Sequence, residues 1–412
     1  MSVRCTDHHT NNTLDLCRDL YNATLQQRIY AYRSGKNVNY NSQQDELPEI
    51  KNAFPEYRSI HSLVMQDVGR RLDKVYDSFF RRMKERRKGK NVRAGFPRFK
   101  YPDRYNSITY AQSGFKIMDN GHVWLSRLGK IRTFMHRSIM GDIKTISVKR
   151  DSVGDWFITL SVETCNKQDK LGEFETTQDT QFQSIKSIGV DLGLNSIITT
   201  SGGMQTNPTQ FLRKSGKKLT KAHRHLSRKK KGSGKRRRSR TRVAKIHRKM
   251  GRQRDDLSHK LSRNLVENHD FIAFEALNIM RMMKNHHLAK SIADASWNTI
   301  VQYTTYKTES AGNEVVLVDP RNTSKQCSKC GYIKESLKLS ERIFHCDSCG
   351  IEIDRYINAT INIRNRGLKS VGRGIPEVMP VEIGALLKAT PVAEAGSPLR
   401  YSRSKITSSI TL

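Results

Sequence analysis

The stretch SIGVDLGLNSIITT (187–200) decides the fold of the C-terminal half of the chain. Its first five residues form an apolar run typical of a buried strand, and SIITT (196–200) supplies a second strand that can return beside it. FIAFE (271–275) and EVVLVD (314–319) are further buried strands, and helical periodicity marks residues 240–269 and 289–310 between and after them. Buried strands that alternate with helices predict an α/β unit over residues 184–320.

The net charge indicates the class of partner. The 412 residues include 74 Lys and Arg against 39 Asp and Glu, a formal net charge of +35. Such an excess attracts polyanions, so it favours nucleic acid, with an acidic membrane as the alternative. No apolar run reaches the roughly 18 residues that span a bilayer, and MSVRCTDHHTNN (1–12) lacks the apolar segment of a signal peptide. We therefore expect a cytoplasmic, nucleoid-associated protein with no membrane partner and no obligate protein partner.

Much of this charge lies between Arg213 and Arg254, where 21 residues are Lys or Arg and none is Asp or Glu. The block leads into the amphipathic helix expected at 240–269, which favours a structured surface over a disordered basic tail. The side chains at its centre are expected to bind phosphates without sequence preference. They are Arg228, Lys229, Lys230, Lys231, Arg236, Arg237 and Arg238.

The N-terminal half divides by pattern into a helical and a β segment. Apolar residues recur at helical spacing from about residue 12 to residue 87, and a Pro-broken loop, FPRFKYP (96–102), follows. From 107 to 163, short β-rich runs alternate with turn signals such as DNG (119–121), which predicts a small antiparallel, barrel-like β-domain. Residues 164–184 are polar and are expected to form a linker.

Two further places offer contacts to nucleic acid. Gln66, Arg70 and Lys74 stand four residues apart along the expected helix, so they share one face that suits a duplex groove. A merely solvated face is the alternative for these three side chains. Arg321 follows the EVVLVD strand, where it is expected to contact a substrate phosphate.

Four of the seven cysteines form two CxxC pairs that are separated by fifteen residues: Cys327, Cys330, Cys346 and Cys349. A CxxC turn points both sulfurs at one metal ion, and two such turns complete the tetrahedron that structural zinc requires. A glycine follows each pair, where the turn needs a positive φ. Since all four ligands are cysteine, no open position is left for catalysis, and the sequence predicts a structural zinc ribbon.

Asp191 ends one buried strand and Glu275 ends another. An ionised carboxylate among apolar residues is costly unless it is paired or holds a metal. Each residue alone is more often a strand-end cap than a catalyst. Two carboxylates on neighbouring strands of a basic protein favour an Mg²⁺ site instead. Paired Mg²⁺ ions can activate water and stabilise the leaving oxygen in phosphodiester cleavage.

These motifs, in this order, resemble the TnpB (OrfB) family of transposon-encoded proteins, which is related to the type V CRISPR effectors. The matching stretches are GVDLGLNS (189–196), LSRKKKGSGKRRRSR (226–240), IAFEALNI (272–279), VDPRNTSKQCSKCG (318–331), CDSCG (346–350) and NATINI (358–363). The resemblance implies guide RNA and target double-stranded DNA as partners, with cleavage beside a short duplex motif. In that scheme base pairing reads the sequence, and the protein reads the motif and the shape of the heteroduplex.

The resemblance also implies a multidomain α+β architecture. A helical recognition domain (1–105) precedes a small wedge-like β-domain (106–183). A ribonuclease H-like RuvC nuclease domain follows in two parts, 184–320 and 353–370, and the zinc ribbon (321–352) is inserted between them. The last segment, 371–412, has Gly, Pro and Ser without a period, and we expect it to be disordered.

Carried over by position, Asp191 matches the family's first catalytic Asp and Glu275 its catalytic Glu, both as Mg²⁺ ligands. The family's last motif usually reads D-R-D-x-N-A-A, whereas residues 354–360 here read DRYINAT, with Tyr356 at the ligand position. A phenol is a poor replacement for a bridging carboxylate. Asp354 is the candidate substitute, but residues two apart on a helix point about 200° away from each other. Its place at the helix start suits an N-cap.

The sequence departs from the family at a second place, its N-terminus. Family members usually begin with a basic, apolar strand that belongs to the β-domain. Here MSVRCTDHHTNN (1–12) leads almost at once into a helix, so we expect that edge of the β-domain to be unpaired.

Three functions are left open by these observations. The first is an RNA-guided DNA-binding protein whose RuvC-like endonuclease site is impaired by Tyr356, and which acts in its nuclease-dead form as a transcriptional repressor. The second is a fully active RNA-guided DNA endonuclease that supports transposon maintenance. The third is a decaying transposon remnant, against which the intact cysteine pairs and both carboxylates argue. Whether this copy is an enzyme depends on Tyr356.

Overall fold

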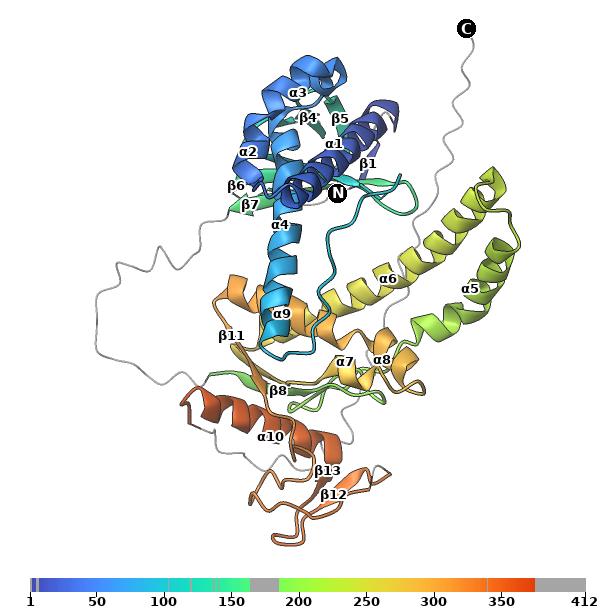
Figure 1. Cartoon of the computed structure of the whole chain (residues 1–412). Helices are drawn as coiled ribbons and strands as arrows, with labels where there is room; N and C mark the ends of the chain where they lie inside the picture. Colours follow the sequence, from blue (N-terminus) through green and yellow to red (C-terminus); the bar gives the residue numbers. More distant parts are fainter. Residues whose placement is uncertain are drawn as a thin grey trace. The chain divides into compact units, whose positions relative to one another are not determined.

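The computed structural model of the chain describes residues 2–4, 7–102, 104–118, 121–135, 138–139, 141–163, 185–338 and 340–374. Two compact units, Met1–Gly172 and Glu173–Leu412, each contain a hydrophobic core of their own (Figure 1). The expected linker (164–184) and the expected disordered tail from residue 375 onward lie outside the described residues. Within the described part, no helix combines the length and the apolar character that a membrane crossing needs.

Helices form the first part of the first unit, as the periodicity predicts. They are α1 (Asp7–Arg33), α2 (Tyr40–Asp45), α3 (Leu47–Ala53), the 3-10 helix η1 (Pro55–Ser59) and α4 (Ser62–Arg87). The side chain of Asn39 accepts the N–H of Ser42 and so caps α2, and His61 caps α4 in the same way through the N–H of Leu63. Residues 96–102 form a loop, also as predicted.

A seven-stranded antiparallel sheet completes this unit. Its strands are β1 (Ser2–Arg4), β2 (Ser107–Ala111), β3 (Phe115–Met118), β4 (His122–Leu125), β5 (Gly129–Phe134), β6 (Asp142–Arg150) and β7 (Trp156–Glu163), in the order β2-β6-β7-β1-β5-β4-β3. β1 lies between β5 and β7, with Ser2 opposite both Phe134 and Phe157. The prediction of an unpaired N-terminal edge is therefore wrong: three extended residues suffice to bridge two neighbouring strands through backbone hydrogen bonds.

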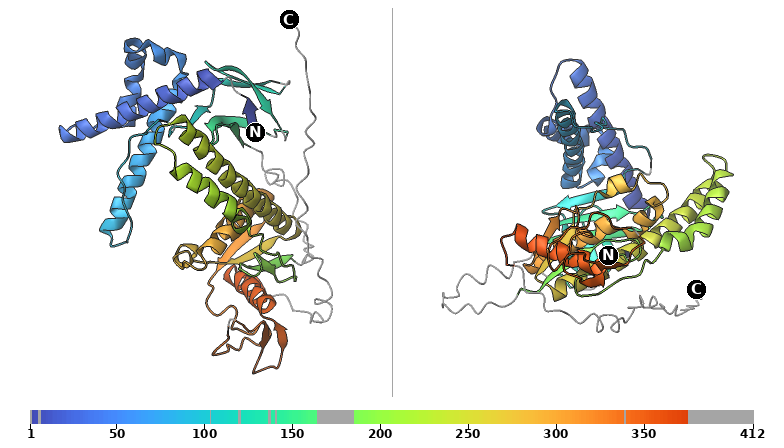
Figure 2. Two further views of the ribbon diagram at one scale, coloured as in Figure 1. Left: turned by 90° about the vertical axis from the view of Figure 1, so that its right-hand side faces the viewer. Right: turned by 90° about the horizontal axis from the view of Figure 1, so that it is seen from below.

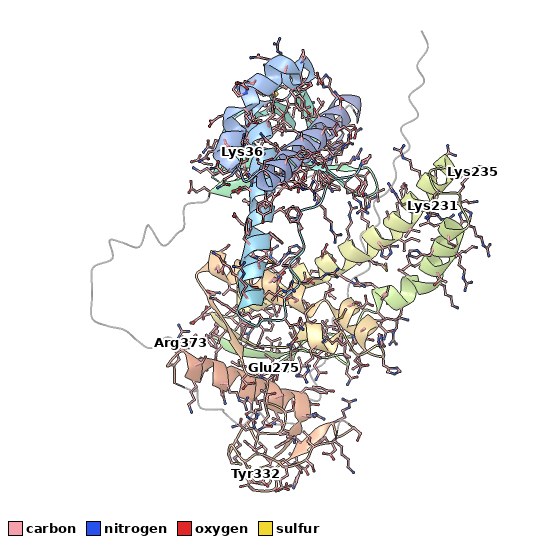
Figure 3. All side chains as sticks on the ribbon, in the orientation of Figure 1. Lys36, Lys231, Lys235, Glu275, Tyr332 and Arg373 are labelled. Atoms are coloured by element: carbon pink, nitrogen blue, oxygen red, sulfur yellow. The ribbon has the colours of Figure 1, made fainter. Side chains whose placement is uncertain are left out.

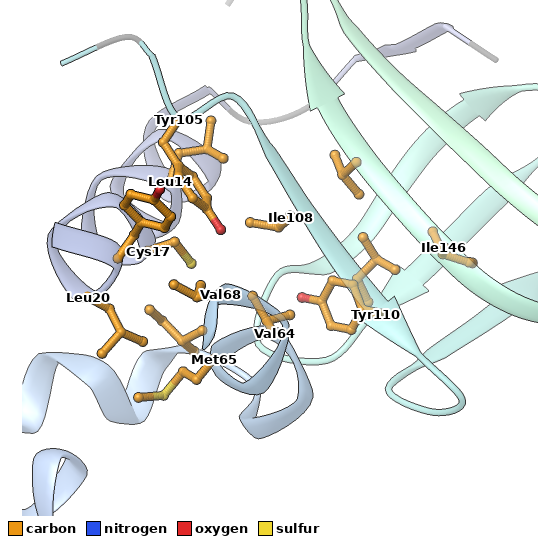
Figure 4. Packing of buried hydrophobic residues seen from close by; sticks show 14 of the residues in the cluster. Leu14, Cys17, Leu20, Val64, Met65, Val68, Tyr105, Ile108, Tyr110 and Ile146 are labelled. Atoms are coloured by element: carbon orange, nitrogen blue, oxygen red, sulfur yellow. The ribbon is translucent and has the colours of Figure 1, made fainter. Parts of the chain in front are cut away.

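The helices and the sheet of this unit share one hydrophobic core (Figure 4). Cys17 of α1, Val68 of α4 and Ile108 of β2 are each at most 1% exposed and belong to the same cluster. Arg71 of α4 also donates to the carbonyl oxygen of Ser107 at 2.7 Å. The described helices up to residue 102 and the sheet up to residue 163, which were predicted to lie in separate domains, therefore share one hydrophobic core.

The second unit is built on a four-stranded sheet whose order is β11-β10-β8-β9. The strands are β8 (Ser187–Asp191), β9 (Thr199–Thr200), β10 (Phe271–Glu275) and β11 (Glu314–Val318). β8, β10 and β11 run parallel, and β9 is antiparallel to β8. The three predicted strands and the hairpin after residue 191 are confirmed, although β9 is shorter than SIITT. β8 and β10 are buried as predicted, but β11 lies at the edge of the sheet and is only partly buried, with Leu317 55% exposed.

Helices cover both faces of this sheet (Figure 2). The helices of this unit are α5 (Phe211–Ser227), α6 (Gly234–Asn268), α7 (Ile279–Met282), α8 (Ala289–Ala295), α9 (Trp297–Ala311) and α10 (Arg355–Ser370), of which α5 packs against α6 and α8 and not on the sheet. Ile272 and Phe274 of β10 pack in the cluster that contains Leu265 of α6, whereas Phe271 and Ala273 pack in the cluster that contains Ile363 of α10. This alternation is what a strand between two helical layers requires.

Two helix boundaries differ from the predicted ones. α6 starts at Gly234 instead of about residue 240, because the side chain of Ser233 accepts the N–H of Arg236 and caps the helix there. The helix predicted over 289–310 is broken into α8 and α9 at Ser296, whose φ is 55°. The basic block thus forms a helical hairpin, α5 and α6, which agrees with the expected structured surface.

Glycine allows α10 to lie directly on the sheet. A methyl group at Gly189 of β8 would stand 1.9 Å from the carbonyl oxygen of Thr360. At Gly367 of α10, it would stand 2.8 Å from the Cβ of Ala273. Larger side chains at either glycine would push helix and sheet apart, so these two positions set the depth at which α10 is seated.

Candidate functional site

Asp191 and Glu275 lie side by side at the carboxyl ends of the two inner strands of the second sheet. The register pairs Val190 of β8 with Phe274 of β10, so the residues that follow both of them occupy the carboxyl ends of adjacent parallel strands. Glu275, labelled in Figure 3, is 8% exposed, and Asp191 is half-buried. The structure therefore brings together the two carboxylates that the sequence singles out.

The surroundings of this pair favour the protonated form of each carboxyl when no cation is bound. Burial raises the pKa of Asp191 to about 6, against the N–H of Leu192 and the charge of Arg355, which lower it. Burial also raises the pKa of Glu275 to about 7. The hydroxyl of Thr323, which donates to Glu275 Oε1 at 2.5 Å, lowers this pKa, and the negative charge of Asp191 raises it further. Adjacent buried carboxylates with raised pKa values suit a divalent cation, whose charge replaces the protons.

These shifts predict a pH dependence of stability in Mg²⁺-free buffer. The ordinary pKa values are 3.8 and 4.5, so between about pH 4 and pH 7 the folded protein holds protons that the unfolded chain has lost. The free energy of unfolding should therefore fall by a few kcal/mol as the pH rises through that window, and level off above it. Urea denaturation measures the fall. Added Mg²⁺ should raise the free energy of unfolding again at pH 8.

The matched control for this measurement is the double variant Asp191→Asn and Glu275→Gln, in which neither side chain titrates. The difference in unfolding free energy between the unmodified protein and this variant isolates the two carboxyls from all other groups. If that difference is the same at pH 4 and at pH 7, the pKa values of the pair are not raised and the idea is wrong.

Asp354 caps α10. Its Oδ1 accepts the backbone N–H of Tyr356 at 2.8 Å and that of Ile357 at 3.1 Å, which is the geometry of an N-cap. Among the described residues, no third carboxylate, histidine or cysteine joins Asp191 and Glu275 to form a group of three possible metal ligands. The N-cap role that the sequence indicates for Asp354 is confirmed, and this role uses Oδ1 of the carboxylate that was the candidate third ligand.

The side chain of Tyr356 contacts the loop that follows Asp191. The amide oxygen of Asn195, in the orientation that satisfies both neighbours, accepts the Tyr356 hydroxyl at 2.8 Å and Arg342 Nη1 at 2.8 Å. Arg342 also donates to the Tyr356 hydroxyl, and its guanidinium lies 5.6 Å from the centre of the tyrosine ring. Three chain segments therefore meet at this phenol. Sequence reasoning missed this contact, because no local pattern points to Asn195 or Arg342.

Hydrogen bonds connect Glu275 to the segment that begins the first CxxC turn. Thr323 uses its hydroxyl for Glu275, and its carbonyl oxygen accepts Nδ2 of Asn362 in α10 at 2.9 Å. Asn362 also donates to the carbonyl oxygen of Gln326 at 2.6 Å, and Asn358, one turn earlier, donates to the same oxygen at 2.7 Å. Both asparagines are almost fully buried, so these bonds are shielded from water.

The same network reaches the cysteines. Asn358 Oδ1 accepts the N–H of Ser328, the residue after Cys327, at 2.9 Å. Sequence reasoning missed this role of the two asparagines in NATINI (358–363), although their spacing of four residues places them on one helix face. The partners could not be read from that spacing, because they lie in a different segment.

The four cysteines of the CxxC pairs come together between β12 (Ile343–His345) and the turn at 327–331, and β13 (Glu352–Asp354) pairs with β12. Their sulfurs all lie within 4.8 Å of one another. The distances from Cys327 to Cys349 and from Cys330 to Cys346 are 3.7 and 3.6 Å. A tetrahedron with Zn–S bonds of about 2.3 Å has edges of about 3.8 Å, so the donor set fits structural zinc.

The basic hairpin presents most of the predicted phosphate ligands to solvent, with Lys231 near its tip (Figure 3). Arg236 is the exception. Its Nη1 donates to the carbonyl oxygens of Leu226 and Lys229, both at 3.0 Å, and so closes the turn between α5 and α6. The structure therefore gives Arg236 a structural contact, because its side chain folds back over the turn, whereas the other predicted residues are exposed except for half-buried Lys229.

A basic groove runs between α5 and α6, and sequence reasoning did not find it. Its volume is about 770 Å³, and its walls carry seven side chains that can bear positive charge: Lys214, Lys218, Lys221, His225, Arg242, Lys245 and Lys249. The signal was the recurrence of lysine every three or four residues from 214 to 221, which puts them on one face of a helix. A concave surface of one charge focuses the field on a polyanion.

The remaining predicted contacts are dispersed. Arg70 and Lys74 of α4 are exposed and Gln66 is half-buried, so the three do form one accessible face in the first unit. Arg321 is exposed in the second unit, where its N–H bonds to Asp319 Oδ1 at 3.0 Å. No contact with phosphate follows from these positions alone, and these roles stay predictions.

Known proteins resemble the chain along most of its length. A family model described as "Probable transposase" (OrfB_IS605) matches residues 165–286, and one described as "Cas12f1-like, TNB domain" matches residues 297–363. The chain is 30% identical over 372 residues to a "Putative RNA-guided DNA endonuclease" of Streptomyces pristinaespiralis, which covers 88% of this chain and 87% of that protein. It is 27% identical over 369 residues to "Putative RNA-guided DNA endonuclease InsQ" of Escherichia coli (strain K12), a match that covers 85% of this chain and 86% of that protein.

Among solved structures, a cryo-EM structure of a Cas12f1-sgRNA-target DNA complex aligns with 86% of this chain and 94% of the other, at 15% sequence identity and a TM-score of 0.33.

Proposed function

Because the chain belongs to the TnpB family of RNA-guided DNA endonucleases, we propose that it binds a guide RNA and a matching double-stranded DNA, and that its second unit holds an impaired nuclease centre. The observation that carries this proposal is the placement of Asp191 and Glu275 at the ends of adjacent parallel strands. A DNA target also accords with a nucleoid-associated position in the cytoplasm.

The topology of the second sheet supports a ribonuclease H-like, RuvC-type domain. An antiparallel hairpin, β8 and β9, is extended on the other side by the parallel strands β10 and β11, and helices cover both faces. The carboxylates stand where the strands end, which is where open α/β sheets place their ligands. The helix α10, the last segment of the proposed domain, is seated on β8 at Gly189.

Asp191 and Glu275 are the proposed Mg²⁺ ligands. The bound ion would supply the positive charge that activates water and stabilises the leaving oxygen in phosphodiester cleavage. The chain itself prepares the ligands: the N–H of Leu192 and the hydroxyl of Thr323 each hold one carboxylate in place. Tyr356 offers a phenol where the family has its third carboxylate, and that phenol is bonded to Asn195 and Arg342 instead.

Phosphate contacts are the proposed role of the basic hairpin. The groove between α5 and α6 gathers its cations along two facing helices, which suits the backbone of a nucleic-acid strand more than a single small anion. We assign zinc to the four cysteines, as a structural ion. Through Asn358 and Thr323 the folded ribbon supports the position of Glu275.

Guided binding and cleavage can be measured separately. With its own guide RNA, Mg²⁺ and a matched duplex, we expect the unmodified protein to bind the duplex and to cut it only slowly. Asp191→Asn should abolish the residual cutting and leave binding within about twofold, because one polar group replaces another of the same size. A gel-shift assay follows binding, and the appearance of cut ends follows cleavage.

Two results would overturn parts of this proposal. Efficient double-strand cutting by the unmodified protein would show that Tyr356 does not impair the site, and would favour the fully active enzyme of transposon maintenance. Failure to bind a matched duplex in the presence of the guide would rule out RNA-guided recognition. Binding with slow cutting is what a transcriptional repressor needs, and Tyr356 is the feature that favours this role over that of an active endonuclease.

A further inference from the structure

An aromatic cluster in the first unit has no part in the proposed nuclease. Tyr76, Phe79 and Phe80 of α4 meet Phe96 of the following loop, with ring centres 5.3 to 6.1 Å apart in four pairwise contacts. Only part of this surface is covered. Phe80 is 54% exposed and Phe96 is 49% exposed. Proteins seldom leave several large aromatic rings in one exposed patch unless the patch binds something.

The loop that carries Phe96 also exposes further rings. Phe99 is 44% exposed and Tyr101 is 76% exposed. These residues are not held by a helix or a strand, yet the loop is fixed. Asn22 of α1 makes two hydrogen bonds to the backbone of Lys100, one to its N–H at 2.8 Å and one to its carbonyl oxygen at 3.0 Å. Pro97, a residue of the same loop, is buried. The backbone that carries the exposed rings is therefore held in place, which lowers the entropic cost of binding.

The charge around these rings selects the kind of ligand. Residues 81–100 contain ten Lys or Arg and a single acidic residue, Glu85. Arg81, Arg82 and Arg98 are exposed within this segment. A protein partner that covers an apolar patch does not require such a charge. A nucleic-acid strand does, since it pairs flat bases that stack on rings with phosphates that attract cations.

We propose that the exposed rings of this cluster, Phe80 and Phe96, form an aromatic platform that stacks on unpaired bases of a single nucleic-acid strand, and that Phe99 and Tyr101 of the same loop offer further rings to that strand. The surrounding arginines hold the phosphates of the same strand. Stacking does not distinguish one base from another, so the platform would accept a strand of any sequence. The ligand class is single-stranded RNA or DNA, and the inference does not depend on a nuclease centre in the second unit.

The full-length protein, without guide RNA, is titrated with a short fluorescent oligothymidylate and with an abasic strand of the same length and charge. Fluorescence anisotropy should show about tenfold tighter binding of the strand that has bases. The double variant Phe80→Ala and Phe96→Ala should lose most of this preference and bind the abasic strand as before. An oligouridylate is titrated beside the oligothymidylate. The strand that shows the larger base-dependent preference identifies whether the platform takes RNA or DNA.

Two further variants keep the result interpretable. Phe80→Leu with Phe96→Leu retains the apolar contacts inside the cluster but removes the flat rings, so it should fold and still lose the preference. Tyr32→Ala removes an aromatic side chain that is 85% exposed on α1, outside the platform, and should change nothing. Equal preference for bases in the unmodified protein and in the leucine variant would overturn the proposal.

A photocrosslink locates the strand directly. An oligonucleotide that carries 5-iodouracil forms a covalent bond on irradiation with an aromatic ring that stacks on it, and mass spectrometry identifies the attached peptide. We expect attachment within residues 79–101. Attachment only to other parts of the chain would show that bases stack elsewhere and would also overturn the proposal.

Discussion

Replacing Tyr356 by aspartate is expected to raise the rate of guided DNA cleavage roughly 100-fold, the size of effect that one charge-stabilising group has in other active sites. α10 is seated on the sheet at Gly189, so the backbone at residue 356 is held in place against the strand that ends in Asp191. A carboxylate at this position would complete a set of three oxygen ligands, as Mg²⁺ prefers. Cleavage of a matched duplex under single-turnover conditions measures the change.

Arg342 complicates the single substitution in a testable way. Its guanidinium bonds to the phenol and to Asn195, so it stands ready to pair with any carboxylate introduced at residue 356. An arginine pair would compete with the cation for the new ligand. The double variant Tyr356→Asp with Arg342→Gln should therefore cleave faster than Tyr356→Asp alone, and its rate should reach half-maximum at a lower Mg²⁺ concentration.

Two controls separate this explanation from the alternative ligand. Tyr356→Phe removes the phenol oxygen without adding a carboxylate, and should leave cleavage as slow as before. Asp354→Ala should lower the free energy of unfolding by about 1 kcal/mol through loss of the helix cap, with little effect on cleavage. If Tyr356→Asp has no effect and Asp354→Ala abolishes cutting, then Asp354 is the third ligand and the explanation fails.

The parts of this protein that local pattern determines could be predicted from the sequence. SIGVD, FIAFE and EVVLVD are apolar runs too short for helices, and each is a strand of the second sheet. The meeting of Asp191 with Glu275 followed from their places at strand ends, and the cysteine cluster followed from the two CxxC pairs. In each case a few neighbouring residues carry the whole signal.

The missed features depend on partners far along the chain. Three residues at Ser2–Arg4 carry no pattern of their own, and their strand exists because β5 and β7 offer backbone groups on both sides. Arg236 looks like its charged neighbours, but the carbonyl groups of the turn at 226–229 draw it inward. The spacing of Asn358 and Asn362 indicated that both lie on one face of the helix. It did not indicate which residues contact that face.

Loss of the zinc ligands is expected to affect the carboxylate site as strongly as loss of a carboxylate. Replacing Cys346 and Cys349 by serine removes half of the proposed ligand set, and structural zinc contributes about 10–16 kcal/mol to the folding of small zinc domains. We expect the variant to contain no zinc, the segment 321–352 to unfold, and residual cleavage to disappear. Metal analysis and hydrogen exchange measure the first two effects, and the first unit should keep its protection.

The reason for the effect on cleavage is the hydrogen-bond path from the ribbon to Glu275. Asn358 and Asn362 hold the segment that contains Thr323, and Thr323 holds Glu275. Asn362→Ala breaks this path while it leaves all four cysteines in place. It should retain one zinc ion per chain and lose exchange protection at Lys325 and Gln326, whose N–H groups bond to the carbonyl oxygen of Asn322 in the same segment. It should also cut the duplex roughly 10- to 100-fold more slowly, the usual cost of removing support from a metal ligand.

Asn313→Ala is the matched control, because Asn313 is also an asparagine whose Nδ2 bonds to backbone carbonyl groups of the second unit, those of Val266 and His269. Those bonds tie the end of α6 to the residue before β11 and are not part of the path to Glu275. The control should keep its zinc and its cleavage rate. If Asn362→Ala also keeps its full rate, the ribbon acts on cleavage by some other route, such as direct contact with nucleic acid, and the path through Thr323 has no functional role.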